Sequence, residues 1–382
     1  MDRSKWEYKK LGEVCTVVSG STPKTQIEDF WNGNHFWITP AELDGSTYVS
    51  KSDRLLTDLA IEKTNLTLMP AGTVLLSSRA PIGKVAITTV PMYCNQGFKN
   101  LICSPAVHNK YLYWFLKGKT DYLNSLGRGA TFKEISKTIV ENIKIPVYSI
   151  ETQQNIADEI DCLNEMIAVK QEQLKEFDKL AQSIFYDMFG DVSLTFHELN
   201  SLYEFIDYRG KTPNKISTGI PLITARNIRF GYLDYSVPEF ISFEEFETRK
   251  TRGVAQKGDI LFTTEAPMGF VAIADKDVFS TGQRVITLQR KDKVQIHNVY
   301  MLYYLMSEEF QRILLNNATG VTVKGIKAAK LKKIKVGVPP LSLQQQFAEK
   351  ISAIEAQKEL VKQSIAETQQ LFNSKMDYYF ND

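Results

Sequence analysis

The sequence predicts an α+β protein in which two mixed α/β domains are each followed by a long helix, and in which the two helices form an antiparallel coiled coil. Two observations carry this prediction. Motifs recur in the same order at a spacing close to half of the 382-residue chain, and an unbroken heptad pattern follows each copy. The predicted domains are residues 1–149 and 192–340, and the predicted helices are residues 150–191 and 341–382.

Matched strings in the two halves establish the repeat. Their spacing is 186–191 residues, whereas solenoid repeats have periods of about 20–50 residues, so the pattern indicates a duplicated domain. The matched strings are AGTVLLSSRAPIGKVAI from Ala71 and KGDILFTTEAPMGFVAI from Lys257, GSTPK from Gly20 and GKTPN from Gly210, TFKEI from Thr131 and TVKGI from Thr322, and the Gln-Gln pairs at 153–154 and 344–345.

The first part of each half reads as a mixed α/β domain. Short apolar runs broken by Gly, Pro, Asn and Ser predict strands joined by turns. Examples are residues 73–76 and 85–89 in the first copy and residues 259–262 and 270–273 in the second. Stretches rich in Tyr, Leu and Phe predict one helix around residues 110–126 and another around 298–315, where the aromatic residues are expected to belong to the core.

The second part of each half predicts a coiled-coil helix. Apolar residues alternate at steps of 4 and 3 through 156–188 and 347–379, and no Gly or Pro interrupts either run. At about 1.5 Å per residue each run is about 50 Å long. The expected seam residues are Ile156, Ile160, Leu163, Leu174, Phe177 and Ile184 in the first helix, and Phe347, Ile351, Ile354, Val361, Ile365 and Phe372 in the second. Lys170, Lys358, Thr368 and Lys375 also fall on the seam, where polar residues lower stability but can fix register.

The order of the parts predicts how the helices pair. The first domain leads into the start of the first helix, which runs directly into the second domain. That domain leads through the short link Pro339-Pro340 into the second helix, which must therefore run back along the first. We expect an antiparallel pair with one domain at each end and an approximate twofold axis between them.

Charge is segregated along the chain although the total is only +2. The predicted domains carry net charges of +5 and +6, and the predicted helices carry −7 and −2. Basic surfaces are typical of phosphate binding, although a net charge of this size also occurs by ordinary variation in composition. The acidic outer face of the first helix, with Asp158, Glu159, Asp161, Glu165 and Glu172, is either solvated surface or a contact for protein partners.

No motif for catalysis, a cofactor or a metal is found in the sequence. Gly-Lys-Thr occurs at 118–120 and 210–212, but a phosphate-binding loop also needs a glycine five residues earlier, where this chain has Tyr113 and Phe205. No Gly-x-Gly-x-x-Gly string follows a strand, no Asn/Asp-Pro-Pro-Tyr/Phe string occurs, and the four histidines are scattered. The sequence therefore predicts a binding protein without catalytic residues, cofactor or metal.

Composition also indicates the compartment. No apolar run reaches about 18 residues, so no membrane span is expected. The polar first residues lack the apolar stretch of a signal peptide, and none of the four cysteines lie at Cys-x-x-Cys spacing. We therefore expect a cytoplasmic protein with reduced thiols.

In the order of its parts the chain resembles the specificity subunit of type I restriction–modification systems. Three motifs carry the resemblance: Gly-x-Thr-Pro at 20–23 and 210–213, the Ala-Pro-x-Gly turns at 80–83 and 266–269, and the junctions IKIPVYSIETQQNIA from Ile143 and IKVGVPPLSLQQQFA from Ile334. The family typically has Ile-Pro-x-Pro-Pro-x-x-x-Gln at this junction. Here Tyr148-Ser149 replace the Pro pair in the first copy, and Gly337 replaces a Pro in the second.

The resemblance implies a non-catalytic, DNA-binding subunit. Each domain would be a target-recognition domain that reads one half of a bipartite double-stranded DNA target. The helices would set the spacing of the halves and dock two adenine methyltransferase subunits, and a restriction and translocase subunit would complete the complex. Twofold-related readers sit on half-sites about one turn of DNA, or about 34 Å, apart, which a rod of about 50 Å can span.

The residues that read DNA are expected in turns between strands. In the first domain the candidates are Lys24, Ser77, Ser78, Arg79, Lys84, Asn95, Gln96, Lys99, Arg128, Thr131 and Lys133. In the second domain they are Lys211, Arg226, Asn227, Thr263, Thr264, Glu265, Gln283, Arg284, Thr322 and Lys324. Arg and Lys suit guanine edges, Asn and Gln suit adenine, and Glu accepts from cytosine, although Lys more often contacts phosphate. In the alignment of the two copies, Arg79 corresponds to Glu265 and Gly97 corresponds to Arg284. Such non-conservative exchanges at matched positions are what two different half-sites would require.

Two other functions remain open on the sequence alone. One is a two-headed protein scaffold with a coiled-coil spacer and no DNA specificity. The other is a nuclease or methylase whose motifs are not evident. A DNA reader loses affinity steeply as salt rises, whereas a scaffold needs no DNA.

Overall fold

The computed structural model describes residues 7–129, 133–320 and 322–380. The chain divides into two compact units. Unit 1 comprises Met1–Gln171 with Lys362–Asp382, and unit 2 comprises Glu172–Val361. In the part of the chain that the structure describes, no helix combines the length and apolar character that a membrane span requires.

Unit 1 is built on a five-stranded sheet with the order β2–β9–β6–β7–β4 and a three-stranded sheet with the order β5–β3–β8, and β1 pairs antiparallel with β10. The strands are β1 (Glu7–Lys10), β2 (Cys15–Ser19), β3 (Trp31–Ile38), β4 (Tyr48–Val49), β5 (Arg54–Leu56), β6 (Val74–Leu76), β7 (Val85–Thr88), β8 (Tyr93–Cys94), β9 (Lys99–Cys103) and β10 (Lys144–Val147). The helices of the domain are α1 (Leu11–Val14), α2 (Asp58–Lys63), α3 (Asn109–Gly118), α4 (Thr120–Ser125) and α5 (Lys137–Glu141), with short 3-10 turns at Glu28–Phe30 and Pro40–Glu42.

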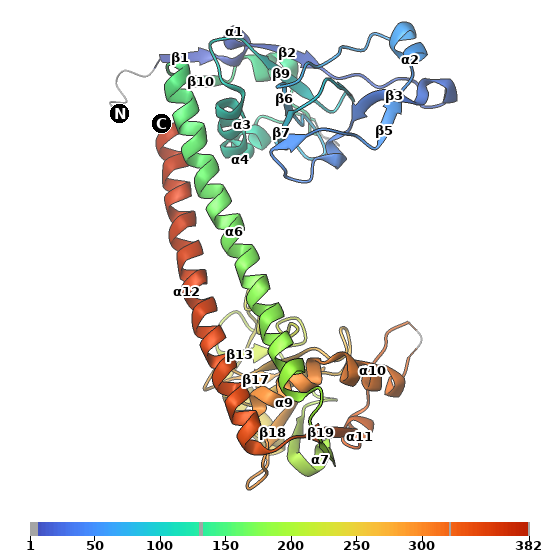
Figure 1. Ribbon diagram of the computed structural model, residues 1–382, viewed down its shortest axis with the longest axis vertical. Coiled ribbons are helices and arrows are strands. Elements are labelled where there is room, and N and C mark those ends of the chain that lie inside the picture. The colour runs from blue at the N-terminus through green and yellow to red at the C-terminus, as the bar shows by residue number, and fades with distance from the viewer. Residues whose placement is uncertain (1–6, 130–132, 321, 381–382) are drawn as a thin grey trace. The chain divides into compact units, whose positions relative to one another are not determined.

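The core of unit 1 lies between helix α3 and the five-stranded sheet. All residues of β6 and β7 are buried because the sheet is covered on both faces. Helix α3 packs against these two strands (Figure 1). Its six consecutive residues from Tyr111 to Leu116 are at most 1 % exposed, so this aromatic run belongs to the core, as expected from the sequence.

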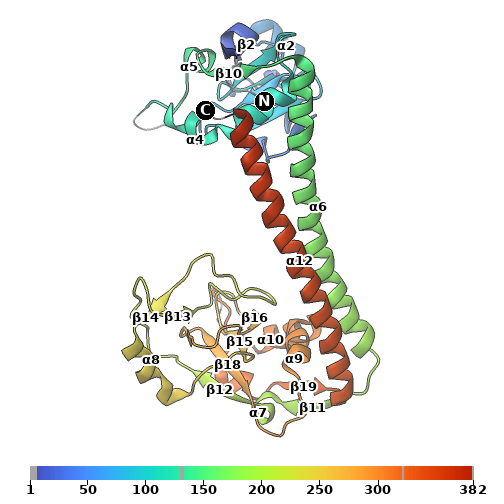
Figure 2. The same ribbon diagram turned by 90° about the vertical axis from the view of Figure 1, so that its left-hand side faces the viewer.

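Unit 2 contains a four-stranded sheet with the order β12–β18–β15–β16 and a three-stranded sheet with the order β14–β13–β17, and β11 pairs antiparallel with β19. The strands are β11 (Thr195–Glu198), β12 (Tyr203–Asp207), β13 (Ile220–Ile223), β14 (Phe240–Ile241), β15 (Ile260–Thr263), β16 (Val271–Ile273), β17 (Ser280–Thr281), β18 (Val285–Arg290) and β19 (Lys335–Val338). The helices of the domain are α7 (Leu199–Leu202), α8 (Phe243–Arg249), α9 (Asn298–Met306), α10 (Glu308–Asn317) and α11 (Ala328–Leu331), with a 3-10 turn at Lys250–Arg252. Helix α9 lies beside the four-stranded sheet (Figure 2).

The topology confirms the internal repeat. Strands β12, β18, β15 and β16 repeat the order of β2, β9, β6 and β7. The three-stranded sheets match as well, because each central strand pairs antiparallel with one neighbour and parallel with the other. Unit 1 differs by the edge strand β4, which pairs parallel with β7. The matched Ala-Pro-x-Gly turns also share a cis peptide bond, at Ala80-Pro81 and Ala266-Pro267.

Each of the two helical stretches expected in the domains is divided into two helices. The first breaks between α3 and α4 at Lys119, and the second breaks between α9 and α10 at Ser307. The Ser307 hydroxyl accepts from the Phe310 backbone N–H at 3.3 Å and so begins α10. A serine at this position therefore ends one helix and caps the next, which the apolar periodicity alone does not reveal.

The long helices are α6 (Ile150–Phe189) and α12 (Leu341–Phe380), each of 40 residues. In unit 1 the first part of α6 lies against the last part of α12 (Figure 1), where Lys170 Nζ donates to Ser364 Oγ at 2.8 Å and to Thr368 Oγ1 at 2.9 Å. Nearer the start of α6, Glu159 lies 2.7 Å from Lys375 Nζ. Higher numbers on one helix thus meet lower numbers on the other, so the pair is antiparallel in unit 1.

Burial along the predicted coiled-coil seam differs from position to position. Ile156, Ile160 and Leu163 are at most 8 % exposed, and Phe347, Ile351 and Ile354 are equally buried in unit 2. The polar seam positions are paired, since Lys358 contacts Asp178 at 2.8 Å, which also makes the helices antiparallel in unit 2. The remaining expected seam residues are half-buried: Leu174, Phe177, Ile184, Val361, Ile365 and Phe372.

The seam shifts by one position near the end of α6. Phe185 and Phe189 are about as buried as any seam residue, whereas Ile184 is only half-buried. Phe185 packs against Phe347 of α12 and against Tyr300 of α9, with ring centroids 5.7 and 5.8 Å apart. Here the helix faces both α12 and the domain core, so the buried face is wider than the heptad pattern predicts.

Candidate nucleic-acid interface

Three loops of unit 1 meet at the end of β6. They are the turn 77–84 between β6 and β7, the segment 95–98 before β9, and residues 127–129 and 133–135 after α4, and all three were expected to contact DNA. Ser78 N donates to Gly97 O at 2.7 Å, and Ile135 N donates to Ser78 O at 3.0 Å. The three segments therefore form one surface although they are separated in the sequence.

Ser77, Lys84 and Lys99 have protein partners within this loop cluster. The buried Ser77 hydroxyl donates to Pro81 O at 2.7 Å and accepts from Lys84 N at 2.8 Å. Lys84 Nζ donates to the backbone oxygens of Pro40 and Leu43, at 3.1 and 2.7 Å. Lys99 is 7 % exposed, and its Nζ lies 3.1 Å from Glu134 Oε1. These contacts hold the loops in place, and a DNA contact by these three side chains stays a prediction.

Ser78 and Asn95 also lie within the cluster. Ser78 is fully buried, and its hydroxyl is 3.5 Å from Lys99 Nζ. The Asn95 side-chain oxygen accepts from Gly97 N at 2.8 Å, which fixes the tight segment before β9. Both residues therefore shape the loops.

The other candidates of unit 1 face solvent. Lys24, Gln96, Arg128 and Lys133 are exposed, and Arg79 is half-exposed. Thr131 lies outside the described residues. Lys24, Arg128 and Lys133 thus present three exposed cations, whereas the Gln96 side chain is hydrogen-bonded to Thr22.

Unit 2 repeats this loop arrangement. Thr264 N donates to Arg284 O at 2.9 Å, and Ile326 N donates to Thr264 O at 3.0 Å, as Ser78 does with its two neighbours in unit 1. The buried Thr263 hydroxyl accepts from Phe270 N at 2.9 Å, the same role that Ser77 has in its turn. Thr263 and Thr264 are therefore structural in the free protein, while Lys211, Thr322 and Lys324 are exposed.

A cleft of about 260 Å³ opens beside these loops in unit 2. It brings together candidates that are distant in sequence, because Arg226, Gln283 and Arg284 all line it. Lys215 adds a third cation, although its Nζ is already paired with Glu239 Oε1 at 2.5 Å. Guanidinium groups and an amide are the side chains that recognise base edges and phosphates, so the chemistry of the cleft suits a nucleic acid.

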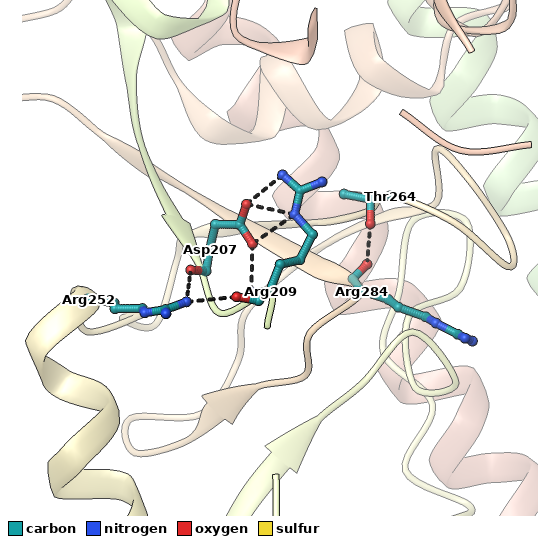
Figure 3. A network of polar contacts seen from close by, with 5 residues as sticks. All are labelled: Asp207, Arg209, Arg252, Thr264 and Arg284. Carbon is teal, nitrogen blue, oxygen red and sulfur yellow. Dashed lines mark hydrogen bonds and ion pairs between the residues drawn. The ribbon is translucent and has the colours of Figure 1, made fainter. Parts of the chain in front are cut away.

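Arg284 and Glu265 form an ion pair at this cleft. Arg284 Nε lies 2.9 Å from Glu265 Oε1, and the two side chains are 53 % and 45 % exposed. The Arg284 backbone oxygen also accepts from the Thr264 hydroxyl at 3.2 Å, so the backbone of this residue is fixed while its side chain extends outward (Figure 3). An exposed pair of this kind is weak and exchangeable, so the guanidinium remains available to a ligand.

The loop that carries Gly-Lys-Thr-Pro begins at a second charged group, also drawn in Figure 3. Arg209 binds both carboxylate oxygens of Asp207, with Nη2 at 2.6 Å from Oδ2. Arg252 Nη1 donates to the Arg209 backbone oxygen at 2.9 Å. These contacts anchor the end of β12, and Thr212, which follows in the chain, lines the cleft.

Several residues that position the site were not expected from the sequence. Thr22 is hydrogen-bonded to Gln96, and at the matched place Thr212 Oγ1 donates to Gln283 Oε1 at 3.4 Å. The matched Gly-x-Thr-Pro motifs therefore tie their loops to the matched glutamines. The recurrence of threonine and glutamine in both copies is a signal that could have revealed this link.

Two buried polar side chains hold the walls of the cleft. Asn227 is 1 % exposed; its Oδ1 accepts from Thr224 N at 2.9 Å, and its amide nitrogen donates to Asp234 O at 3.1 Å, so it is structural in the free protein. Arg249 is also 1 % exposed, and its Nη2 donates to Thr281 O at 2.6 Å, next to the segment 282–284. Burial lowers the pKa of the Arg249 guanidinium, while Glu245, 3.6 Å away, acts in the opposite direction.

The described residues contain no group of three or more His, Cys, Asp or Glu side chains placed to hold a metal ion.

Comparison with known proteins then decides the family. The family described as type I restriction modification DNA specificity domain matches residues 3–178 and again residues 196–370. The chain belongs to this family. The two matches follow the internal repeat, so each half contains one copy of the specificity domain.

Curated relatives and solved structures agree with this specificity family. The MjaIX specificity subunit of Methanocaldococcus jannaschii is 38% identical over 190 residues, which cover 49% of this chain and 44% of that protein. The chain therefore matches less than half of the length of that relative. The MjaVIII specificity subunit of the same organism is 24% identical over 378 residues, covering 92% of this chain and 86% of that protein.

Two solved structures share the fold. The type I restriction–modification S subunit of M. genitalium has a TM-score of 0.58 at 13% identity, covering 100% of this chain and 98% of that one. A chain from a study of complex assembly and conformational transition of the type I system has a TM-score of 0.63 at 18% identity, covering 98% of this chain and 97% of that one.

Proposed function

We propose that this chain is the DNA-reading subunit of a type I restriction–modification complex. The observation that carries the proposal is the cleft of unit 2, where Arg226 from one loop meets Gln283 and Arg284 from another. Family membership supports the same reading. Methylation and cleavage are then carried out by partner subunits, and this chain supplies sequence selection only.

The target is proposed to be bipartite. Residues 1–149 and 192–340 act as two target-recognition domains, and residues 150–191 and 341–382 act as the spacer between them. The loop clusters have the same backbone hydrogen bonds in both units, yet Arg79 stands where the second copy has Glu265, and Gly97 stands where it has Arg284. The same framework therefore presents different side chains, so the two half-sites differ in sequence.

The long helices are proposed to dock two adenine methyltransferase subunits, with a restriction and translocase subunit binding the complex. Part of the acidic face of α6 is already used within unit 1. Asp161 accepts from Trp114 Nε1 at 2.6 Å and pairs with Lys110, and Glu159 pairs with Lys375. Glu165 and Glu172 are exposed, as is the Asp158 side chain. Asp158 lies 3.7 Å from Lys110 and Glu172 lies 2.7 Å from Lys175, and exposed pairs of this kind are weak, so these three carboxylates are the ones proposed to meet a partner.

Methylome sequencing of a host with and without this gene tests the proposal. The expected result is the loss of one split adenine-methylation motif when the gene is deleted. No change in any motif, in a host that carries the methyltransferase gene, would favour the scaffold alternative. Incubation of the purified chain with duplex, magnesium and S-adenosylmethionine gives the matching control, because turnover by the chain alone would show that it is an enzyme.

A further inference from the structure

A dense cluster of lysines lies in unit 2 outside the cleft. Helix α11, strand β19 and the residues beside them form a segment, 327–335, without a single acidic residue. We name its basic members the lysine cluster, and each of them is exposed to solvent. They are Lys327, Lys330, Lys332, Lys333 and Lys335.

The charge of the lysine cluster is not neutralised within the protein. Among the residues that the structure describes, none of the five has a carboxylate oxygen within 4.0 Å of its Nζ, whereas Lys291 and Lys358 in the same unit are paired with acids. Lys330 Nζ donates to Asn317 O at 3.3 Å, and Lys332 Nζ lies 5.4 Å from the centre of the Phe205 ring. Both contacts orient the ammonium groups and leave their charge in place.

The fold does not require this charge. In unit 1, helix α5 and strand β10 correspond to α11 and β19. The strand register supports this correspondence, because Lys144 is opposite Lys10 in the β1–β10 ladder, as Lys335 is opposite Glu198 in the β11–β19 ladder. The positions in unit 1 that match the lysine cluster are Ser136, Ile139, Glu141, Asn142 and Lys144, with a net charge of zero. The same backbone is therefore formed without the lysines, so they serve something other than folding.

A basic groove passes across the lysine cluster. Its volume is about 610 Å³, and Lys330, Lys333 and Lys335 line it together with Asn317 and the ring of Phe196. Phe196 is 55 % exposed, so its ring adds an apolar face to the groove. The groove thus offers ammonium donors, an amide and an apolar face, which suit a phosphate–sugar backbone.

The lysine cluster adjoins the loops that border the cleft. Ile326 N is hydrogen-bonded to Thr264 O at 3.0 Å, and Gly325 is paired with Glu265, whose side chain binds Arg284. Lys324 and Lys327 therefore lie on the two sides of this junction. The exposed cations run from the reading loops into the cluster without an intervening acidic stretch of chain.

We propose that the lysine cluster binds the phosphate backbone of duplex DNA beside the half-site that unit 2 reads. This proposal rests on the DNA-reading function proposed above. Lysine is a flexible point charge and carries no base code, so the cluster adds affinity on every sequence. DNA is favoured over an acidic protein surface because the cluster continues the loops of the proposed reading site.

The consequence is a difference in salt dependence between the two units. Each phosphate contact contributes about 0.9 to the slope of log affinity against log salt. Removal of the three groove lysines should then lower the slope by about 2.7, so that the ratio of wild-type to variant affinity falls about forty-fold over a fourfold rise in salt. Unit 1, whose matched positions carry no net charge, should contribute little of this effect.

The test compares three forms of the full chain by fluorescence anisotropy with a labelled mixed-sequence duplex between about 50 and 200 mM salt. The variant K330Q/K333Q/K335Q removes the groove lysines. The control K250Q/K257Q/K293Q removes the same charge from other exposed positions of unit 2. Thermal unfolding of each form checks folding. If the triple variant is unstable, K333Q alone serves, because the Lys333 side chain makes no hydrogen bond or ion pair with the residues that the structure describes.

The expected result is a slope lowered by about 2.7 in the cluster variant and almost unchanged in the control, with the preference among target sequences retained. Equal losses in both triple variants would show a net-charge effect and overturn the proposal. If the cluster variant has the same slope as the wild type, and the wild type does discriminate among duplexes, this proposal alone would be overturned. A wild type that binds no duplex would instead overturn the proposed function. If the cluster variant no longer binds a partner subunit but still binds DNA as the wild type does, the cluster would be assigned to protein binding.

Discussion

Arg284→Ala separates the reading role of the cleft from its structural role. In the free protein the Arg284 side chain makes one exposed ion pair, with Glu265, and pairs of this kind contribute about 0.2–1 kcal/mol. The contacts that hold the loop use the backbone oxygen of Arg284, which the substitution keeps. The free energy of unfolding should therefore fall by less than about 1 kcal/mol.

Binding should change by more than stability. An arginine that binds a guanine edge with two hydrogen bonds contributes about 1–3 kcal/mol of discrimination, or about a 5- to 150-fold loss of affinity. The loss should appear only for duplexes that carry the correct base in the half-site read by unit 2. Competition anisotropy with single-base variants of each half measures this at one fixed salt concentration.

A matched control is Lys257→Ala, which removes one positive charge from another exposed ion pair of unit 2, with Asp277 at 3.7 Å, outside the residues that line the cleft. We expect it to leave the base preference unchanged. Equal weakening on every duplex by Arg284→Ala would mean that the side chain contacts phosphate, and the base-reading argument for the cleft would be refuted. A loss confined to the other half-site would refute the assignment of the units.

Four further results are expected. Arg79→Ala should cost about 1–3 kcal/mol in the half-site read by unit 1 alone, measured with the same duplexes. Phe347→Ala should lower the free energy of unfolding by about 3–5 kcal/mol in a denaturant titration, because Phe347 is 0 % exposed among Phe185, Phe189 and Tyr303. The control Leu360→Ala, at a residue that is 58 % exposed on the same helix, should change this free energy by less than about 0.5 kcal/mol. Burial lowers the pKa of His108 and of His297 below the ordinary value of 6.5. The unfolded chain therefore binds more protons than the folded chain, and the free energy of unfolding should fall as pH drops below about 6.5. A pH series of melts in which the double variant H108Q/H297Q shows the same fall would contradict this. Deletion of one heptad from α6 should alter the spacer between the half-sites or disrupt folding, and recognition of an unchanged spacer in a methylome would count against the spacing role of the helix.

Periodic patterns made much of the fold predictable. The two heptad runs give α6 and α12 because burial repeats every 3.5 residues along both helices. The repeat gives the matched sheets, since the same strings appear twice in the same order. The pattern does not predict the short strands such as β4 and β8, because two-residue strands carry no periodicity, nor the breaks at Lys119 and Ser307.

The candidate site was predictable at the level of loops and less so at the level of side chains. Turn sequences identify the segments around Arg79 and Gln96 in unit 1 and the segment around Arg284 in unit 2. Within unit 1 the structure brings the first two segments together, and within unit 2 it brings the Arg284 segment against Thr264. Lys84 and Lys99 look like surface cations in the sequence, yet both turn inward to backbone oxygens or to Glu134. Whether a polar residue serves the ligand or the loop depends on contacts with distant segments, which local sequence does not encode.

The account stands on two units that read separate halves of one target. Methylome sequencing of hosts that carry the Arg79→Ala or the Arg284→Ala chain in place of the wild type tests this directly. The account predicts that each substitution relaxes or abolishes base preference in one half of the split motif, and that the two affect opposite halves. Relaxation of the same half by both variants, or uniform loss without any change in motif, would contradict it.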